Sequence, residues 1–434
     1  MEQQTAVTAD AGGQRISVKN IAAGSIGHVM EWFDYAVYAY AAPIIAVLFF
    51  PSTDPVTSLL ATFAVFAVGF ASRPLGALVL GPLGDRIGST KVLSLSVVIM
   101  AIATAFMGIL PTYDQIGIWA PVLLVAARLV QGFSVGAEIG SATTFLVEIA
   151  PRRRRGFYGS WTHQSTAVGM LLASVAFTLL SLNLSDQALE SWGWRVPFLF
   201  SIALAFFGFY LRRKLPNTPK FEEVLEEGTV TDSSYREIFV DRYKTMLRVV
   251  GIIASFTIGF YFIFSYLPSY TSAFVESSFA SAFGANAFGL IFFAIILPFL
   301  GMLSDRIGRK PLMLTGYAGF VVMSYPLLTL MNTGTFAAVV IAQLGFVLML
   351  ALIAAPLQTA LAEIFPTRIR NSSLSISYNV AIALLGGTAP LVATYLSSIA
   401  DDNRLFLALY LGCAGVISFL TMLGIKDRYR DDLV

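Results

Sequence analysis

Long apolar stretches recur along almost the whole chain, and they constrain the fold more than any other feature of the sequence. Each is about 20 residues long, the length that an α-helix needs to cross roughly 30 Å of hydrocarbon. Of the 434 residues, 56% are apolar and only 12% are charged, against about 25% charged in an ordinary soluble domain. Lipid must therefore surround most of the chain, and we predict an all-α polytopic membrane protein.

Breaks at charged and Pro/Gly-rich positions divide the apolar sequence into twelve predicted spans. They are residues 20–49, 57–81, 91–110, 118–148, 157–182, 193–212, 247–274, 286–304, 312–331, 335–362, 372–398 and 405–425. The polar start of the chain shows no apolar core and no cleavage site of a signal peptide, so we expect the first helix to insert uncleaved.

The basic residues predict the orientation of these spans. All but Arg73, Arg128, Arg195 and Arg404 of the 28 Lys and Arg fall in the tails or in the connections that follow even-numbered spans. Basic residues are retained on the cytoplasmic side of a membrane. We therefore expect both termini to be cytoplasmic, in a multi-pass protein of the bacterial inner (plasma) membrane.

Two short sequences occur twice, once in each half of the chain. GPLGDRIGSTK at 81–91 resembles GMLSDRIGRKP at 301–311, and EIAPRRRRG at 148–156 resembles EIFPTRIRN at 363–371. Each copy follows the second or the fourth span of its half, which predicts two parallel six-helix repeats. The expected units are a tail (1–19), a first half (20–212), a cytoplasmic linker (213–246), a second half (247–425) and a tail (426–434).

Several kinds of chemistry find no support in the sequence. Cys413 is the only cysteine and His28 and His163 are the only histidines, so we expect neither a disulfide nor a metal site. No GxxxxGK[ST] phosphate loop is present, which argues against ATP as the energy source. We expect a transporter rather than an enzyme, a functional monomer whose partners are a small-molecule substrate and the lipid bilayer, with no nucleic acid and no cofactor except H⁺ as coupling ion.

The double GxLxDRxG loop on twelve spans resembles the major facilitator superfamily, which implies that fold over the whole length. Five further strings narrow the resemblance to its metabolite:proton symporters: GHVMEWFDYAVYAY, RPLGALVLGPLGDRIG, RLVQGFSVGAE, WGWRVPFLF and FYFIFSYLPSY. That family carries proline and betaine, 2-oxoglutarate, citrate or shikimate. The resemblance therefore implies proton-driven uptake of a small carboxylate-bearing metabolite.

The chain departs from the family pattern in two places, and its substrate cues disagree. Ser89 and Thr90 replace a usual basic pair, and His28 stands where the family often has Asn. The strings YLPSY and GIWAP resemble the proline/betaine branch, whereas Arg128 and the pair at 386–387 look more like the organic-acid branches. Organic acid and zwitterionic osmolyte both remain open as substrates.

Ionisable residues inside the predicted spans lie almost entirely in the first half. A charge at the bilayer centre costs on the order of 2.5–3.5 kcal/mol, so each is a functional candidate. We expect Asp34, assisted by Glu31 on the same helix face, to bind the coupling proton, with Glu138 in reserve. Arg128 has the fork geometry to bind a substrate carboxylate, and we expect it to pair with Asp34 when substrate is absent.

Each of these charges also has a structural interpretation, an ion pair that only neutralises a buried charge. Arg73 in particular, next to Pro74, is expected to form a charge pair and can serve chiefly to brace a kink. His28 can be a pH switch, although a satisfied polar residue at a helix start is the commoner case.

The second half offers neutral polar groups to a substrate. Hydroxyls and amides can hydrogen-bond a small polar molecule, and aromatic rings can face a quaternary ammonium. The candidate substrate-binding residues are Tyr261, Tyr266, Gln358 and Asn379, together with Trp161 and Gln164 of the fifth span. Ordinary packing between helices is the alternative for each.

The repeated loops carry charges that can pair across the two halves. In the superfamily the loop aspartate helps to lock the cytoplasmic gate, which implies that role for Asp85 and Asp305 here. Their expected partners are Arg86, Arg306, Arg152 and the other arginines of 152–155, and Arg368 with Arg370. The alternative is that these charges only set the topology. Glycines 132, 136 and 140 form a stripe that indicates close helix packing, with a hinge as the second interpretation.

These observations favour a proton symporter that works by alternating access. An uncoupled facilitator or exchanger would share the fold but would leave Glu31 and Asp34 without a role. The fifth span lacks the Gly-Pro pair usual in proton-coupled drug exporters, which argues against an antiporter.

Overall fold

The computed structural model describes residues 18–87, 89–136, 147, 150–212, 243–275, 278–365, 367–399 and 403–431. Within these ranges the chain is helical and contains no strand. Eight helices are long and apolar enough to cross a membrane, a bent pair of helices forms a ninth span, and three shorter apolar helices stand where the other predicted spans lie. The predicted all-α, twelve-helix polytopic fold is confirmed.

The first six spans lie in residues 18–212, here called the first half. They are α1 (Val18–Tyr40) with α2 (Ala42–Phe49), α3 (Pro55–Ala71) with α4 (Arg73–Ile87), α5 (Ser89–Ile109), α7 (Trp119–Val135), α9 (Arg155–Asn183) and α11 (Arg195–Arg212). Short pieces connect them: α6 (Tyr113–Ile116), η1 (Arg152–Arg154), α10 (Asp186–Ala188) and η2 (Leu189–Gly193). Most of the predicted fourth span beyond Gly136 lies outside the described residues.

The last six spans lie in residues 243–431, the second half. They are α13 (Tyr243–Tyr261) with η4 (Phe262–Tyr266) and α14 (Leu267–Ala273), α15 (Phe279–Ile307), α16 (Arg309–Met331), α17 (Phe336–Ile364), α18 (Thr367–Ala381) with η5 (Ile382–Gly386) and α19 (Ala389–Ser398), and α20 (Asn403–Leu423). The elements η4 and η5 are π-helical turns inside a span, a distortion that is frequent at functional sites. Residues 213–242, most of the predicted linker, lie outside the described part.

The first predicted span is not one straight helix. It breaks at Ala41, and its two pieces meet at an angle of 56°. Pro43 stands in the first turn of α2 and has no N–H with which to continue the hydrogen bonding of α1. The predicted span over 20–49 is therefore formed by two helices with a bend between them.

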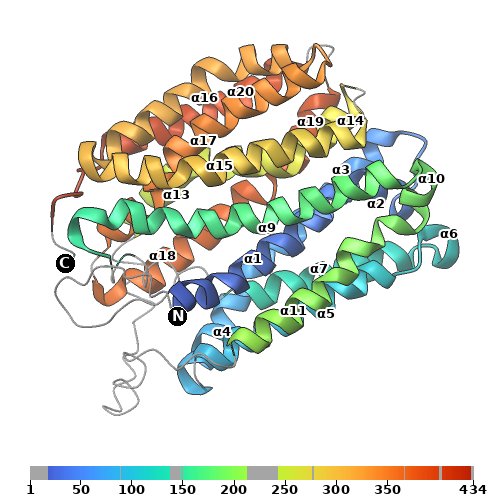
Figure 1. Cartoon of the computed structure of the whole chain (residues 1–434), viewed down its shortest axis with the longest axis horizontal. Coiled ribbons are helices and arrows are strands. Elements are labelled where there is room, and N and C mark those ends of the chain that lie inside the picture. Colours follow the sequence, from blue (N-terminus) through green and yellow to red (C-terminus); the bar gives the residue numbers. More distant parts are fainter. Residues whose placement is uncertain are drawn as a thin grey trace, which may run out of the picture.

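The two halves pack side by side along several helices. Helix α9 of the first half lies along α15 and also contacts α17 of the second half, while α3 contacts α19. Figure 1 shows α9 and α15 running together through the middle of the molecule, with α16 and α20 on one side and α5 and α11 on the other. The interface between the halves is thus placed along the centre of the fold.

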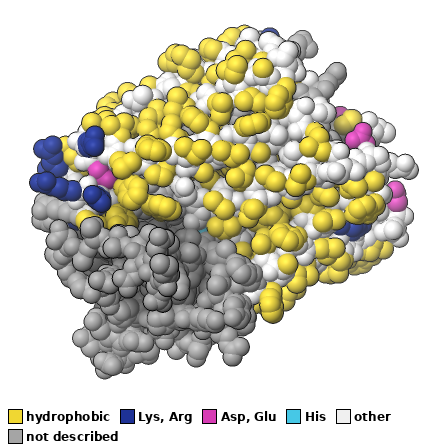
Figure 2. Space-filling model, in the orientation of Figure 1, with side chains coloured by type: hydrophobic (Ala, Val, Ile, Leu, Met, Phe, Trp, Pro, Cys, Tyr) yellow, Lys and Arg dark blue, Asp and Glu magenta, His cyan; other side chains and the backbone are white. Residues whose placement is uncertain are grey.

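Charge is separated from apolar surface on the outside of the molecule. Figure 2 shows hydrophobic side chains over most of the visible face, with Lys and Arg gathered at one end. This end, where α9 begins and α15 finishes, is called the loop end below. An apolar belt bounded by a basic end is typical of a membrane-spanning protein.

Candidate functional site

A buried charge pair lies where α1 meets α4. Arg73 Nη2 donates to Glu31 Oε1 at 2.8 Å, and both side chains are fully buried. Arg73 Nε also donates to the Tyr35 hydroxyl at 3.2 Å. Burial of either charge alone would be costly, so the pair and its hydrogen bonds explain how both ions fit inside the membrane.

His28 extends this pair by one further contact. Its Nδ1 lies 3.2 Å from Glu31 Oε2, and its Nε2 accepts the indole N–H of Trp32 at 3.0 Å. Because an indole N–H can only donate, the proton of a neutral His28 lies on Nδ1 and faces Glu31. Thr166 of α9 also lies within 3.1 Å of His28 Nε2. Glu31 is thus contacted from two directions, by the charge of Arg73 and by the ring N–H of His28.

Asp34 is held differently, by uncharged groups. The Thr104 hydroxyl donates to Asp34 Oδ2 at 3.0 Å, and Gln131 Nε2 donates to that hydroxyl oxygen at 2.7 Å. The oxygen of the Gln131 amide accepts Arg128 Nη1. Asp34, Thr104, Gln131 and Arg128 therefore form a chain of hydrogen bonds across α1, α5 and α7, buried along its whole length.

The expected direct pair between Asp34 and Arg128 is not formed. No carboxylate among the described residues lies within ion-pairing distance of Arg128, and its Nη1 donates instead to the side chain of Gln131, three residues later on the same helix. Arg128 Nη2 donates to the Phe66 carbonyl at 3.3 Å, and Nε has no partner in the described structure. A buried guanidinium with no anion is a site that an anionic group can complete.

Tyr35 separates the two buried arginines. The guanidinium carbons of Arg73 and Arg128 lie 4.5 Å and 5.2 Å from the centre of its ring. Arg128 also lies 4.4 Å from the ring centre of Tyr38, and Arg73 lies 4.8 Å from that of Phe70. Cation–π contacts thus stabilise both guanidinium groups without using up their hydrogen-bond donors.

The candidate residues of α13 and η4 differ in their contacts. Tyr266 hydrogen-bonds Ser397 at 2.7 Å and the Ala393 carbonyl at 3.3 Å, so it joins two spans. The hydroxyl of Tyr261 is buried and has no partner in the described structure. Its ring packs 5.1 Å from Phe70, which places it at the interface of the halves beside the buried charges. Of these two hydroxyl groups, that of Tyr261 is the one left without a described partner.

The remaining polar candidates also lie near this interface. Asn379 Nδ2 donates to the Gly136 carbonyl at 3.3 Å, while its Oδ1, like Gln164 Oε1, is buried with no partner in the described part of the chain. Gln358 lies 3.5 Å from His163, across the halves. Trp161 is 38% exposed, so it is less enclosed than the others. Glu138, the reserve proton site, lies outside the described residues.

Sequence reasoning missed the residues that connect the charges. Tyr35, Thr104 and Gln131 are buried polar residues inside apolar spans. Gln131 had one usable signal, since it lies three residues after Arg128 and so shares its helix face. Thr104 had none, because only packing brings α5 against α1.

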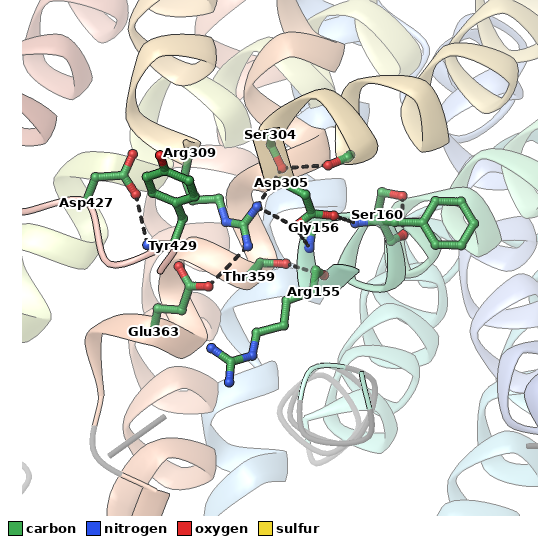
Figure 3. Close-up of polar contacts among 12 residues, drawn as sticks. Arg155, Gly156, Ser160, Ser304, Asp305, Arg309, Thr359, Glu363, Asp427 and Tyr429 are labelled. Carbon is green, nitrogen blue, oxygen red and sulfur yellow. Dashed lines mark hydrogen bonds and ion pairs between the residues drawn. The ribbon is translucent and has the colours of Figure 1, made fainter. Parts of the chain in front are cut away.

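A second polar cluster closes the loop end. Asp305 at the end of α15 accepts the backbone N–H groups of Gly156 and Phe157 at 2.8 Å and 2.9 Å. These are first-turn N–H groups of α9, whose own preceding residue provides no side-chain cap. Asp305 therefore caps a helix of the opposite half, where the helix dipole favours a negative charge. Figure 3 shows this contact beside Arg309 and Glu363.

Arg309 holds the aspartate in place. Its Nη1 lies 2.7 Å from Asp305 Oδ1 and its Nη2 lies 3.3 Å from Glu363 Oε1. The expected partner Arg306 is exposed instead, because consecutive helical residues point in different directions. Arg309 and Glu363 were not predicted. The side chains of Asp85, Arg86, Arg152, Arg368 and Arg370 lie outside the described part of the structure.

The C-terminal segment touches the same cluster. Asp427 accepts the backbone N–H of Lys310 at 3.0 Å, and Arg155 donates to the Asp431 carbonyl at 3.0 Å. Lys310 Nζ donates to carbonyl oxygens of Leu423 and Ile425. The segment after α20 thus reaches from the second half to the start of α9. Figure 3 shows Asp427 and Tyr429 of this segment beside Arg309.

Comparison with known proteins identifies the class of this fold. The family model described as Major Facilitator Superfamily matches residues 24–390. The glycine betaine/proline/ectoine/pipecolic acid transporter OusA of Dickeya dadantii is 35% identical over 96% of this chain and 84% of its own length. The proline/betaine transporter of Escherichia coli is 35% identical over 94% of this chain and 83% of its own. The ectoine/proline transporter ProP of Corynebacterium glutamicum is 37% identical over 86% and 76%.

Solved structures agree on the fold. The crystal structure of a D-xylose-proton symporter covers 96% of this chain and 99% of its own with a TM-score of 0.76 at 19% identity. Fold and relatives together define a multi-pass membrane transporter of small molecules, not an enzyme. The chain belongs to the major facilitator superfamily, and the resemblance to its metabolite:proton symporters is confirmed by the proline/betaine transporters among its relatives.

Proposed function

We propose that this transporter couples uptake of a small zwitterionic osmolyte, of the proline or betaine class, to the entry of protons. The relatives named above as proline and betaine transporters support the substrate class. One observation carries the proposal: Arg128 is fully buried with no carboxylate partner in the described structure, and a hydrogen-bonded chain links it to the acid Asp34.

In this proposal Arg128 binds the carboxylate of the substrate. The guanidinium of Arg128 lies over the rings of Tyr38 and Phe66 in cation–π contacts. A substrate carboxylate would replace Gln131 at Nη1 and could also accept from the neighbouring Nη2, whose described acceptor is the Phe66 carbonyl at 3.3 Å. The cationic end of a zwitterion would then be available to the aromatic rings near Tyr261, where an unused hydroxyl also lies.

Asp34 is the better candidate for the proton. Glu31 is already matched by Arg73 and His28, so protonating it would leave Arg73 buried without its counter-ion. The described contacts of Asp34 are with uncharged groups, and a change in its protonation breaks no ion pair. We propose that a substrate arriving at Arg128 favours proton uptake at Asp34, with Glu31 as its neighbour and Glu138 as an alternative site.

We also propose an orientation, a gate and an oligomeric state for the protein. The basic loop end is cytoplasmic, both termini lie there, and the membrane is the bacterial inner membrane. The Asp305 contact with α9 serves as a gate at that end, and the equivalent role belongs to Asp85 in the first half. The protein works as a monomer and draws on the proton gradient, not on ATP.

The test is transport by purified protein in proteoliposomes. Asp34→Asn should abolish accumulation of labelled proline and glycine betaine driven by an imposed pH gradient, while exchange of substrate across the membrane continues, because exchange does not require release of the proton. Wild-type accumulation should collapse on addition of a protonophore, which an uncoupled facilitator would not show. Citrate, a polyanion, should compete poorly.

Asp54→Asn is the matched control. Asp54 is an exposed carboxylate that caps α3, and hydrogen bonds from Thr57 and Val56 keep its pKa below the ordinary value. Its replacement should leave gradient-driven uptake unchanged. Continued accumulation by Asp34→Asn against a concentration gradient would remove Asp34 from the proton site.

A further inference from the structure

Thr104 lies between the acid assigned to the proton and the arginine assigned to the substrate. Its hydroxyl oxygen is 3.0 Å from Asp34 Oδ2, 3.0 Å from the Met100 carbonyl oxygen and 2.7 Å from Gln131 Nε2. We propose that this hydroxyl is a rotating donor that satisfies Asp34 in both its charged and its neutral form, and that Gln131 transmits the change to Arg128. The inference rests on the proposed function and adds two positioning residues to it.

The hydroxyl group of Thr104 has one hydrogen to donate and two lone pairs that can accept. Gln131 Nε2 can only donate, so it occupies one lone pair of Thr104. While Asp34 is ionised it can only accept, and the hydroxyl hydrogen must point to it. When Asp34 is protonated it can donate into the second lone pair, and Thr104 turns its hydrogen to the Met100 carbonyl. Both states are satisfied without movement of any heavy atom.

The amide of Gln131 has one orientation that fits its neighbours. Arg128 can only donate, so the amide oxygen faces Arg128 and the NH₂ group faces Thr104. A substrate carboxylate that takes Arg128 Nη1 removes that donor from Gln131. Hydrogen bonds in a chain polarise one another in a low-dielectric interior. The loss therefore weakens the donation to Thr104, and with it the support for an ionised Asp34.

Few other ionisable groups can act on Asp34. Its own helix carries Glu31, paired with Arg73 of α4, and His28. Arg128 of α7 reaches it only through Gln131, and α9 provides His163. The side chains described for α5 are all uncharged, as are those of α11 beyond Arg195. Thr104 is thus the group through which the charge of Asp34 is most directly stabilised.

Thr104→Val tests the rotating donor, because valine keeps the shape and lacks the hydroxyl. In proteoliposomes, proline or glycine betaine uptake driven by a pH gradient should fall roughly tenfold, since an ionised Asp34 loses its donor and releases its proton poorly. Exchange should fall less than about twofold. The external pH at which uptake is half-maximal should rise by about one unit, because Asp34 keeps its proton to higher pH. Thr104→Ser, which keeps the hydroxyl, should resemble wild type.

Gln131→Glu tests the contact between residue 131 and Arg128 and keeps a side chain of the same length. Its carboxylate would pair with Arg128 and compete with the substrate carboxylate, so the KM for exchange should rise roughly tenfold while the rate at saturation is largely kept. Gln131→Leu should uncouple the two sites instead. In that variant, substrate should no longer change the pH dependence of proton uptake.

The possible results distinguish a failure of the Thr104 and Gln131 roles from a failure of the proposed function. If Thr104→Val lowers net uptake and exchange equally and leaves the pH midpoint in place, the residue only packs and the rotating donor is refuted. An unchanged KM in Gln131→Glu would refute the link to Arg128, even if the valine variant proves too unstable to purify. Failure of the Asp34→Asn test would instead overturn the proposed proton site, whatever Thr104 does.

Discussion

Tyr261 and Tyr266 are five residues apart on one span, yet their hydroxyl groups have different surroundings. The Tyr266 hydroxyl joins η4 to α19 through Ser397 and Ala393. The Tyr261 hydroxyl has no partner in the described structure, although its ring is buried. A buried hydroxyl without a partner is costly, and at a transport site the cost is explained if a ligand satisfies it.

The two Tyr→Phe variants should therefore separate binding from stability. Tyr261→Phe should raise the KM of transport about fivefold, the value of one net hydrogen bond, and should leave thermal stability in detergent nearly unchanged. Tyr266→Phe should lose about 1 kcal/mol of stability and keep the KM. Transport kinetics and thermal unfolding of both variants provide the check, and the reverse pattern would place the substrate contact at Tyr266.

At the scale of elements, small residues decide how closely the helices approach. A Cβ added to Gly132 of α7 would lie 1.7 Å from the Gly69 carbonyl oxygen of α3. A Cβ at Gly136 would lie 2.2 Å from the Arg73 carbonyl oxygen. The glycine stripe thus serves close packing, as its first interpretation held, and it lets α7 approach the backbone at Gly69 and Arg73. Gly140 lies outside the described residues.

Alanine substitutions should distinguish a glycine that lies against the backbone of another helix from a glycine with free space around it. Gly132→Ala should destabilise the protein by about 3 kcal/mol, because backbone cannot move aside as a flexible side chain does. Gly284 of α15 is the control, since its nearest neighbour would be Phe336 Cε2 at 3.9 Å. Gly284→Ala should be neutral or stabilising by up to about 1 kcal/mol through helix propensity. Thermal unfolding with transport assays would test both, and a stable, active Gly132→Ala protein would contradict the packing argument.

The glycine pair at 386–387 has a similar explanation. A Cβ at Gly386 would meet the Tyr261 ring at 2.5 Å, and one at Gly387 would meet Phe70 at 2.6 Å. The pair allows the span of α18 and α19 to contact both halves at their interface. Packing therefore accounts for these residues, and they say little about which substrate is carried.

At the scale of the whole molecule, the halves are joined at both ends of the interface. Asn286 of α15 donates to the Tyr40 hydroxyl at 2.7 Å, and Ser174 of α9 donates to the Phe283 carbonyl at 2.9 Å. Both contacts involve the first part of α15, which lies away from the loop end (Figure 1). At the loop end Asp305 caps α9. If the protein works by the proposed alternating access, these two sets of contacts break in turn.

Asp305→Asn should release the loop end selectively. The two N–H groups of α9 need two acceptor oxygens, and asparagine has one. Spin labels at Arg153→Cys and Ile307→Cys, in a Cys413→Ser background, should show a broader distance distribution extending to longer distances. Arg306→Gln, an exposed neighbour, should leave the distribution as in wild type. An unchanged distribution in Asp305→Asn would mean that this contact does not hold the halves together.

The sequence alone was enough to predict the helices, their number, the repeated loops and the family. Those features depend on local properties, because apolar length and the position of basic residues act on each span separately. It also identified Glu31, Asp34, Arg73 and Arg128, since a charge in an apolar span is visible without knowing its neighbours.

Only the tertiary structure decided which groups these charges meet. Asp34 meets Thr104, and Thr104 meets Gln131, because α5 packs against both α1 and α7. Asp305 meets the start of α9 because the halves close against each other there. A hydrogen bond depends on the approach of two particular atoms to within about 3 Å, and that approach is set by helix packing between segments far apart in the chain.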